Sequence, residues 1–409
     1  MKSDYEIAND NIMSPISAVA AKMGLPADML VPYGNYKAKI NISEFDSGKI
    51  AAAKLILVTA ITPNKAGVGK TTTSVGLADG LRKLKKNVIL TLREPSLGPC
   101  FGMKGGAAGG GYSQVVPMED INLHFTGDFH AITAANNTLS ALIDNYRFYN
   151  RGKPEGIKTV LMKRCLDVND RALRNIVTAL NGPNNGIISE TGFVITPASE
   201  LMAVLCLSEG LDDLRNKLND MLLGFTFAGA PFTTQDLEVT GAITALMKDA
   251  ILPNLVQTLE HTPAIIHGGP FANIAHGCNS IMATKTAMQY GDYVITEAGF
   301  ASDLGAEKFF NIKCRKAGLQ PAMSVLVATL QALKLNGGIE EKNMKLPDMN
   351  ALQEGLKNLE KHISILKSFG QKVLVVINRH QIDDAAELDF IRNWCAGKGA
   401  AFAVNDAFT

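Results

Sequence analysis

The chain has 409 residues, of which 46% are hydrophobic and 19% are charged, so it can bury a core larger than one ordinary domain needs. A formal net charge of +1 argues against a general nucleic-acid or membrane-surface binder, because neither polyanion would meet a sizeable basic field. The six cysteines form no C-x-x-C pair, which favours reduced thiols over disulfides or a zinc site. No run of about 18 apolar residues occurs, and the start is too polar for a signal peptide, so we expect a cytoplasmic protein.

Short β-rich segments alternate with longer helical patterns along the chain, which is typical of a parallel sheet with helices on both faces. In chain order, strands are predicted at 54–59, 88–92, 158–162, 192–195, 264–267, 293–296, 324–328 and 373–378. Helices are predicted at 74–81, 201–206, 211–223 and 349–369. The pattern predicts an α/β fold with a large, doubly wound, mostly parallel sheet of the P-loop NTPase type.

The loop between the first predicted strand and helix has the pattern of a phosphate-binding loop, with Asn64 in place of the usual first glycine. A strand that ends where a helix begins directs backbone N–H groups and the positive helix end at one anion. Lys70 is then placed to reach the outer phosphates of ATP, and the Thr71 hydroxyl to coordinate Mg²⁺. The predicted nucleotide-binding residues are Thr62, Pro63, Ala66, Gly67, Val68, Gly69, Lys70, Thr71 and Thr72. The alternative is an ordinary glycine-rich turn between a strand and a helix, without a role in phosphate binding.

The second predicted strand ends in Arg93 and Glu94 and runs on into the glycine-rich segment 105–111. We expect this strand to lie beside the first one, so that the segment reaches the same crevice. The planar guanidinium of Arg93 suits a carboxylate or an acyl phosphate. A structureless linker is the alternative for the glycines.

Two further segments carry histidines: 118–130 combines imidazoles and carboxylates with apolar residues, and 267–280 combines imidazoles with glycines. Segment 118–130 contains His124 and Asp128, and segment 267–280 runs from a predicted strand at His267 through a glycine-rich loop. A histidine is more often structural than catalytic, and the spacing from His267 to His276 matches no metal pattern.

Together these segments resemble the formate–tetrahydrofolate ligases. The similarity rests on 92–99, 105–112, 117–130, 267–280 and 297–315 in this order, and it extends over essentially the whole chain. It implies a ligation in two steps. Formate first attacks the γ-phosphate of ATP to give formyl phosphate and ADP, and the N10 amine of tetrahydrofolate then takes the formyl group.

The resemblance also implies roles for individual residues. Lys70 and Arg93 are the expected catalytic residues, with Arg93 holding formyl phosphate. The expected substrate-binding residues are Arg93, Glu94, His124, Asp128, His267, His380 and Phe408. His380 and Phe408 stand where the family usually carries the phenylalanine and tryptophan that clamp the pterin ring, and Val68 stands where it usually carries glutamate.

The family resemblance gives the expected domain plan and partners. We expect a nucleotide-binding region over 1–360, with an inserted substrate-site subdomain over roughly 135–290, and the start of a folate-side domain over 361–409, because family members run on beyond this point. Formate, tetrahydrofolate, ATP with Mg²⁺, a monovalent cation and a homo-oligomer are implied; nucleic acid and membrane are not expected partners. Two alternatives remain: a truncated relative that binds nucleotide without ligase activity, and a P-loop ATPase switch module, to which only Lys65 points.

Overall fold

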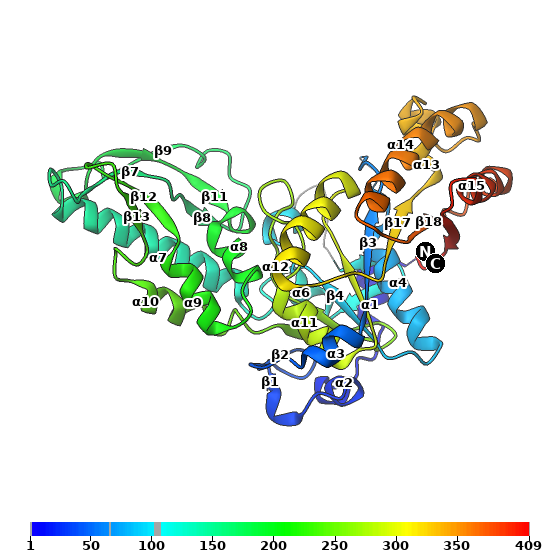
Figure 1. Ribbon diagram of the computed structural model, residues 1–409, viewed down its shortest axis with the longest axis horizontal. Helices are drawn as coiled ribbons and strands as arrows, with labels where there is room; N and C mark the ends of the chain where they lie inside the picture. The colour runs from blue at the N-terminus through cyan, green and yellow to red at the C-terminus, as the bar shows by residue number, and fades with distance from the viewer. Residues whose placement is uncertain (1, 65–66, 102–107, 409) are drawn as a thin grey trace.

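One large mixed sheet forms the centre of the molecule in the computed structural model, which describes residues 2–64, 67–101 and 108–408 (Figure 1). Its strands are β1 (Leu30–Pro32), β2 (Ala38–Ile40), β3 (Lys54–Ala60), β4 (Val88–Leu92), β5 (Gly109–Gly110), β6 (Ser113–Val116), β14 (Asn254–Thr258), β15 (Pro263–Ile266), β16 (Tyr293–Glu297), β17 (Met323–Ala328), β18 (Val373–Asn378) and β19 (Ala401–Asn405). Among the described residues the strand order is β1-β2-β14-β15-β4-β16-β3-β17-β18-β19. Neighbouring strands from β15 to β19 are parallel, and β14, β2 and β1 continue the sheet in antiparallel fashion.

Helices cover both faces of this sheet. They are α1 (Asp4–Asn9), α2 (Ile16–Met23), α3 (Ser47–Ala52), α4 (Lys70–Lys83), α5 (Leu97–Cys100), α6 (Met118–Asn122), α11 (Ile281–Tyr290), α12 (Arg315–Ala317), α13 (Leu330–Asn336), α14 (Met349–Ser368) and α15 (Ala385–Gly397). The connections β3–α4–β4 and β15–α11–β16 run in opposite directions along the strand order. Right-handed crossovers therefore place α4 and α11 on opposite faces, as Figure 1 shows.

A separate lobe projects from one side of the sheet (Figure 1). It contains the helices α7 (Asp128–Tyr149), α8 (Glu200–Cys206), α9 (Leu211–Asn219) and α10 (Thr240–Met247), and the strands β7 (Ile157–Val160), β8 (Arg164–Leu166), β9 (Ile176–Thr178), β10 (Ser189–Thr191), β11 (Phe193–Ile195), β12 (Leu222–Thr226) and β13 (Pro231–Thr233). These strands form small sheets of their own, β13-β12-β7, β11-β8 and β10-β9. The chain leaves the central sheet through α7 and returns to it at β14.

The structure corrects three predictions made from the sequence. The predicted strands 158–162 and 192–195 form, as β7 and β11, but they belong to the lobe and not to the main sheet. The predicted helix 211–223 ends at Asn219, and Leu222 begins strand β12. Strand β4 does not lie beside β3, because β16 lies between them and pairs in parallel with both.

The physical reasons for these errors differ. Leu222 and Leu223 extend the helical spacing of apolar residues, although in the structure they alternate in burial as strand residues do. Strand order within a parallel sheet leaves little trace in a sequence, since each crossover can skip a position.

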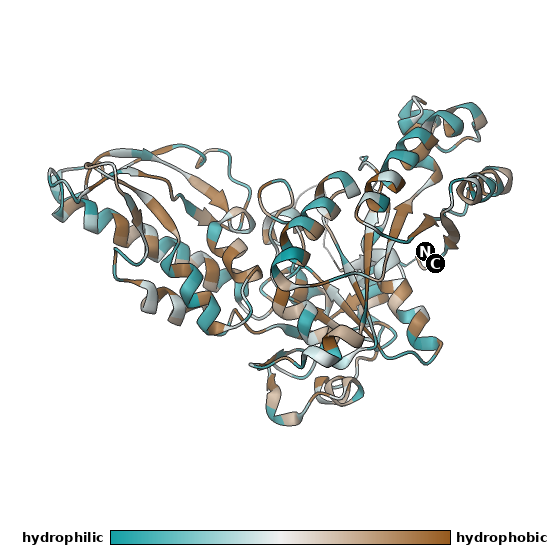
Figure 2. Ribbon diagram, in the orientation of Figure 1, coloured by the Kyte–Doolittle hydropathy of each residue, from teal (hydrophilic) through white to brown (hydrophobic). Residues whose placement is uncertain are grey.

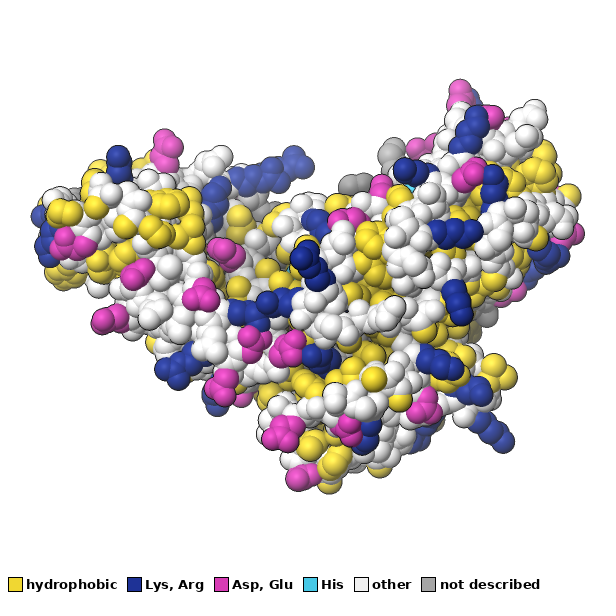
Figure 3. Space-filling view, in the orientation of Figure 1, with side chains coloured by type: hydrophobic (Ala, Val, Ile, Leu, Met, Phe, Trp, Pro, Cys, Tyr) yellow, Lys and Arg dark blue, Asp and Glu magenta, His cyan; other side chains and the backbone are white. Residues whose placement is uncertain are grey.

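The core follows the strands of the central sheet, which appear hydrophobic in Figure 2, whereas the outer helices carry the hydrophilic residues. On the face shown in Figure 3 charges of both signs are interspersed, in agreement with the small net charge. Hydrophobic side chains gather on the lobe, where Leu161, Phe225 and Phe227 are exposed. Among the described residues no helix is both long enough and apolar enough to span a membrane.

Candidate active site

The predicted phosphate-binding loop connects β3 directly to α4, which begins at Lys70. Gly67 and Gly69 both adopt left-handed backbone conformations, with φ of 71° and 72°. A Cβ atom at Gly69 would lie 2.2 Å from the side-chain nitrogen of Asn378, so only glycine allows this close approach. The N-cap residue of α4 is Gly69, which has no side chain to cap the helix. Ala66, which we predicted to bind nucleotide, and Lys65 lie outside the described residues.

Thr71, in the first turn of α4, faces a carboxylate that the sequence patterns had not singled out. Its hydroxyl donates to both carboxylate oxygens of Glu297, at 3.1 Å each, and Ser74 Oγ lies 3.4 Å from one of them. Glu297 is the last residue of β16, the strand that pairs with β3, and its side chain is nearly buried. A hydroxyl on the helix and a carboxylate on the neighbouring strand are the oxygen ligands that P-loop enzymes use for Mg²⁺.

Val68 and Thr72 belong to the inner side of the loop. Val68 is 5% exposed and packs into the main hydrophobic core, and its carbonyl oxygen accepts a hydrogen bond of 3.4 Å from Asn378 Nδ2. Thr72 is buried as well. Val68 has an apolar side chain that packs in the core and brings no carboxylate to the loop. The carboxylate beside Thr71 is that of Glu297 on β16.

The first residues of the loop are tied to a neighbouring helix. Asn358 of α14 donates a hydrogen bond of 2.8 Å to Thr62 Oγ1, which also lies 3.0 Å from His362 Nε2. The other ring nitrogen of His362 lies 2.6 Å from Ser302 Oγ. Burial lowers the pKa of His362, so the ring is neutral at physiological pH. Pro63, by contrast, is exposed.

Arg93 and Glu94 follow β4 at the same edge of the sheet as the loop, because β4, β16 and β3 are parallel and their carboxyl ends coincide. Arg93 Nη1 donates to the Pro270 carbonyl oxygen at 3.1 Å, while Arg93 Nε has no partner among the described residues. Glu94 is buried and its Oε2 is likewise unpaired there. Burial, with the nearby charge of Asp128 second, raises the pKa of Glu94 well above its usual value.

Asp128 belongs to a buried polar cluster at the start of α7. Its Oδ1 accepts a hydrogen bond of 2.6 Å from Lys39 Nζ, and its Oδ2 accepts one of 2.7 Å from Asn254 Nδ2. The side chains of Lys39 and Asp128, which form this ion pair, are both almost completely buried. Asp128 therefore lies close enough to Glu94 to affect its pKa. Both carboxylate oxygens of Asp128 are already hydrogen-bonded, to Lys39 and Asn254.

The two predicted site histidines lie in different surroundings. His267 is completely buried, and its ring nitrogens lie 2.6 Å from Ser280 Oγ and 2.7 Å from the Ala250 carbonyl oxygen. Burial lowers the pKa of His267 to about 4. His124 is exposed, and its Nδ1 lies 2.8 Å from His130 Nε2. Neither ring is hydrogen-bonded to the described residues of the predicted phosphate-binding loop.

His380 and Phe408 follow the adjacent parallel strands β18 and β19. The side chain of His380 is 44% exposed, and Phe408 is 41% exposed. Between them, Arg379 and Asp406 form a two-point ion pair with distances of 2.6 and 2.9 Å, which joins the two loops. The Phe408 ring lies over Gly110, where a Cβ atom would come within 3.2 Å of the ring. Segment 102–107, which contains the start of the glycine-rich run, lies outside the described residues.

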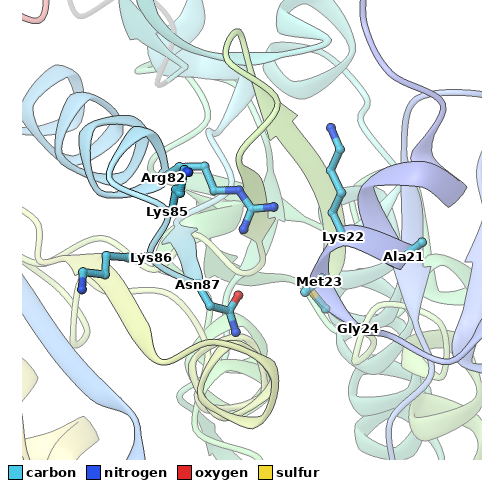
Figure 4. A pocket seen from close by; sticks show the side chains of 8 residues that line it. All are labelled: Ala21, Lys22, Met23, Gly24, Arg82, Lys85, Lys86 and Asn87. Atoms are coloured by element: carbon cyan, nitrogen blue, oxygen red, sulfur yellow. The ribbon is translucent and has the colours of Figure 1, made fainter.

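A cavity also lies away from these residues. It has a volume of about 600 Å³ and lies at the opposite end of α4 from the loop, with Lys22 and Arg82 on opposite walls and Lys85, Lys86 and Asn87 around them (Figure 4). A second cavity of about 110 Å³ lies within the lobe. No cluster of three or more histidine, cysteine or carboxylate side chains among the described residues could hold a metal ion by itself.

The carboxyl edge of the parallel sheet thus gathers most of the candidate residues. Sequence reasoning missed Glu297 as a partner of Thr71, although its place at the end of a predicted strand was a signal for it. It also missed the buried Lys39. The arrangement defines an α/β protein with a glycine-containing loop before a helix, a cationic residue and a partly exposed aromatic pair on one edge of a sheet.

Comparison with known proteins gives the family. The family model described as formate–tetrahydrofolate ligase matches residues 2–409. The chain is 59% identical over 408 residues to a protein of Porphyromonas gingivalis named formate–tetrahydrofolate ligase, and 59% identical over 409 residues to a protein of the same name from Bacteroides fragilis. In both cases the match covers 100% of this chain and 74% of the relative. This chain belongs to the formate–tetrahydrofolate ligase family.

Proposed function

We propose that this chain ligates formate to tetrahydrofolate at the expense of ATP, giving 10-formyltetrahydrofolate, ADP and phosphate. The family membership over residues 2–409 carries this proposal. A formate oxygen attacks the γ-phosphorus of ATP and ADP leaves, which forms formyl phosphate. The N10 amine then attacks the formyl carbon, and the C–O bond to phosphate breaks as phosphate leaves.

In this proposal the connection β3–loop–α4 is a phosphate-binding loop of the P-loop NTPase type. The left-handed conformations of Gly67 and Gly69, and the glycine at the N-cap of α4, support it. Lys70 opens the helix and acts on the outer phosphates. Because phosphoryl transfer depends on position and charge neutralisation more than on covalent help, such a loop supplies much of what the first step needs.

We assign Thr71 and Glu297 to Mg²⁺ binding. The Thr71 hydroxyl and the Glu297 carboxylate, 3.1 Å apart at the ends of neighbouring elements, are hard oxygen donors of the kind that Mg²⁺ prefers. Two such ligands are enough, since Mg²⁺ usually keeps several waters and binds nucleotide phosphates. When bound, the ion neutralises charge on the transferring phosphoryl group.

Arg93 is the residue that we assign to formyl phosphate. Among the described residues its guanidinium is anchored by one hydrogen bond, to Pro270, so most of its donors remain for an anion. It follows β4, which is separated from the loop strand β3 by β16 alone. Glu94, which burial keeps protonated to higher pH than usual, is placed next to it as a donor toward the folate.

We assign His380 and Phe408 to the pterin ring. Their exposure and the ion pair that joins their loops support this role. Imidazole and phenyl rings both offer a π face for stacking, with less area than an indole. His124, Asp128 and His267 complete the proposed site by resemblance only.

The domain plan and assembly are also proposals. We propose that the lobe from α7 to α10 is the substrate-side part inserted into the nucleotide-binding region, and that residues from 361 onward form part of the folate side. A homo-oligomer and a bound monovalent cation follow from the resemblance. Light scattering of the purified protein, with and without potassium or ammonium ions, tests both.

An isotope experiment tests the formyl phosphate route. With formate labelled with ¹⁸O in both oxygens, attack on phosphorus places one formate oxygen between carbon and phosphorus. That oxygen stays with phosphate when the amine displaces it. We expect one ¹⁸O atom per phosphate released. Phosphate without label would contradict the proposed sequence of steps, and absence of 10-formyltetrahydrofolate would contradict the proposed function.

A further inference from the structure

A buried lysine behind the candidate site has no place in the mechanism above. Lys313 belongs to a π-helical turn, Phe309–Cys314, and is completely buried. Its ammonium donates to Asn279 O at 2.8 Å, to Asn279 Oδ1 at 2.7 Å and to Thr284 Oγ1 at 2.7 Å. These bonds use its three N–H donors, and every acceptor is neutral.

The charge of Lys313 is not paired by any carboxylate among the described residues. Burying an unpaired ammonium is unfavourable, and burial lowers the pKa of Lys313 from its usual value. A methionine would fill the same volume without that penalty. For packing alone, a lysine is therefore less favourable here than a methionine. The hydrogen bonds of Lys313 must provide the reason for a lysine at this position.

Those hydrogen bonds help to fix the orientation of Asn279. Its Oδ1 accepts from Lys313 and also, at 2.8 Å, from the Thr284 hydroxyl, which Lys313 itself contacts. The Asn279 amide nitrogen therefore points at two strands, donating to Thr296 Oγ1 at 2.9 Å and Thr91 Oγ1 at 3.3 Å. Thr91 and Thr296 are register partners in the parallel pair β4–β16. Thr91 comes two residues before Arg93, and Thr296 comes directly before Glu297. The amide thus bridges the strand ends that carry two residues of the candidate site.

Other positively charged side chains also hold the loop of residues 270–279, which ends at Asn279. Three cations donate to oxygens of segment 270–279: Arg93 to Pro270, Lys308 to the carbonyls of residues 272 and 275, and Lys313 to Asn279. π-Helical turns such as the one that contains Lys313 occur frequently at functional sites. The loop that ends at Asn279 is therefore held by positive side chains on the side of the sheet edge where Arg93 lies.

We propose that Lys313 is a positioning residue: it holds Asn279 across β4 and β16, so that Arg93 and the Glu297–Thr71 pair keep the separation that one phosphoryl group requires. The proposal rests on the proposed function for the identity of that group. Lys313 does not touch the substrate. It acts through Asn279, and its loss therefore affects phosphate binding and turnover while nucleotide binding at the loop is retained.

The main test uses Thr296→Val, which removes one acceptor of the bridge, keeps the side-chain shape and leaves the Lys313 contacts intact. The matched control is Thr286→Val on α11, because Thr286 is equally buried and its hydroxyl has no partner among the described residues. Lys313→Met, which can lower the folding yield, serves as a second variant. Two quantities are measured: kcat of formate-dependent ADP release, and calorimetric affinity for inorganic phosphate in the presence of Mg²⁺ and ADP.

We expect Thr296→Val to lower both kcat and phosphate affinity about three- to tenfold, the effect of one ordinary hydrogen bond, with ADP affinity unchanged. Lys313→Met should lower them about ten- to hundredfold, because bonds to a charged donor are lost. Thr286→Val should behave as wild type. Equal behaviour of Thr296→Val and Thr286→Val in both assays would overturn the proposal.

The calorimetric assay separates this proposal from the proposed function. If the wild-type protein releases no formate-dependent ADP, the proposed function fails, but the phosphate titration still decides the role of Lys313. If the wild-type complex with Mg²⁺ and ADP binds no phosphate, there is no phosphoryl site to position, and the inference is overturned.

Discussion

Replacing Glu297 by glutamine tests the assignment of the magnesium ligands. The substitution removes the negative charge but keeps the shape and one acceptor oxygen for Thr71, whose hydroxyl lies 3.1 Å from both carboxylate oxygens in the native protein. Because Glu297 is 8% exposed, solvent screens its charge little. We therefore expect a protein that folds normally but binds Mg²⁺ weakly.

The size of the effect follows from electrostatics. The Coulomb attraction between the carboxylate and a divalent ion is largely offset by the loss of hydration of both charges, so the net effect is much smaller than the Coulomb energy. Residues that support a metal site typically change metal affinity about 10- to 100-fold, or about 1.4–2.7 kcal/mol. We expect the Mg²⁺ concentration for half-maximal activity of Glu297→Gln to rise by this factor.

The assay is formate-dependent ADP release at saturating ATP over a range of Mg²⁺ concentrations. Glu260→Gln is the control, since it removes the same charge from a half-exposed carboxylate that pairs with Lys83 at the surface. An unchanged Mg²⁺ dependence in Glu297→Gln would refute the assignment. A loss of folding, visible as a lower melting temperature than that of the control, would show that the carboxylate is needed for structure.

Three further results are expected. Arg93→Ala should lower kcat about 10²- to 10³-fold, about 2.7–4 kcal/mol of barrier, by analogy with oxyanion-hole donors, while ATP affinity measured by calorimetry stays constant; near-normal turnover would contradict the role of Arg93. Arg379→Ala should free the loops that carry His380 and Phe408 and raise KM for tetrahydrofolate but not for ATP, and equal changes in both would argue for general loosening. The folded-state pKa of His267, about 4, lies below its unfolded value of about 6.5, so the unfolded chain binds more protons between these values and stability to urea should fall by about 3 kcal/mol from pH 7 to pH 4. His267→Asn should reduce that slope, and an equal slope in both proteins would contradict the assignment.

The strand–loop–helix arrangement of the predicted phosphate-binding loop could be read from the sequence because its determinants are local, whereas its binding of phosphate stays a prediction. A strand, two glycines with positive φ, a lysine and a helix follow one another within a short segment, and the structure has Gly67, Gly69 and Lys70 in that arrangement. The resemblance to a family added the reaction, and the comparisons show that family. All eight predicted strands also form, six of them in the central sheet, since continuous apolar runs are typical of buried parallel strands.

The remaining features depend on contacts that are distant in sequence. The Glu297–Thr71 contact requires β16 to insert between β3 and β4, which no local pattern reveals. Lys313 and Asn279 meet through a π-helical turn, whose periodicity differs from that of the α-helix. The lobe strands were assigned to the main sheet because their sequences resemble any short strand, and only the structure shows which partners they take.

The most direct test of the account is a coupled assay on the purified chain with Mg²⁺ and ATP, with and without formate and tetrahydrofolate. ADP release and 10-formyltetrahydrofolate are followed in parallel. We expect one equivalent of 10-formyltetrahydrofolate to accompany each ADP, and its formation to require all three substrates. ADP release that is indifferent to formate, or ATP binding without any product, would contradict it.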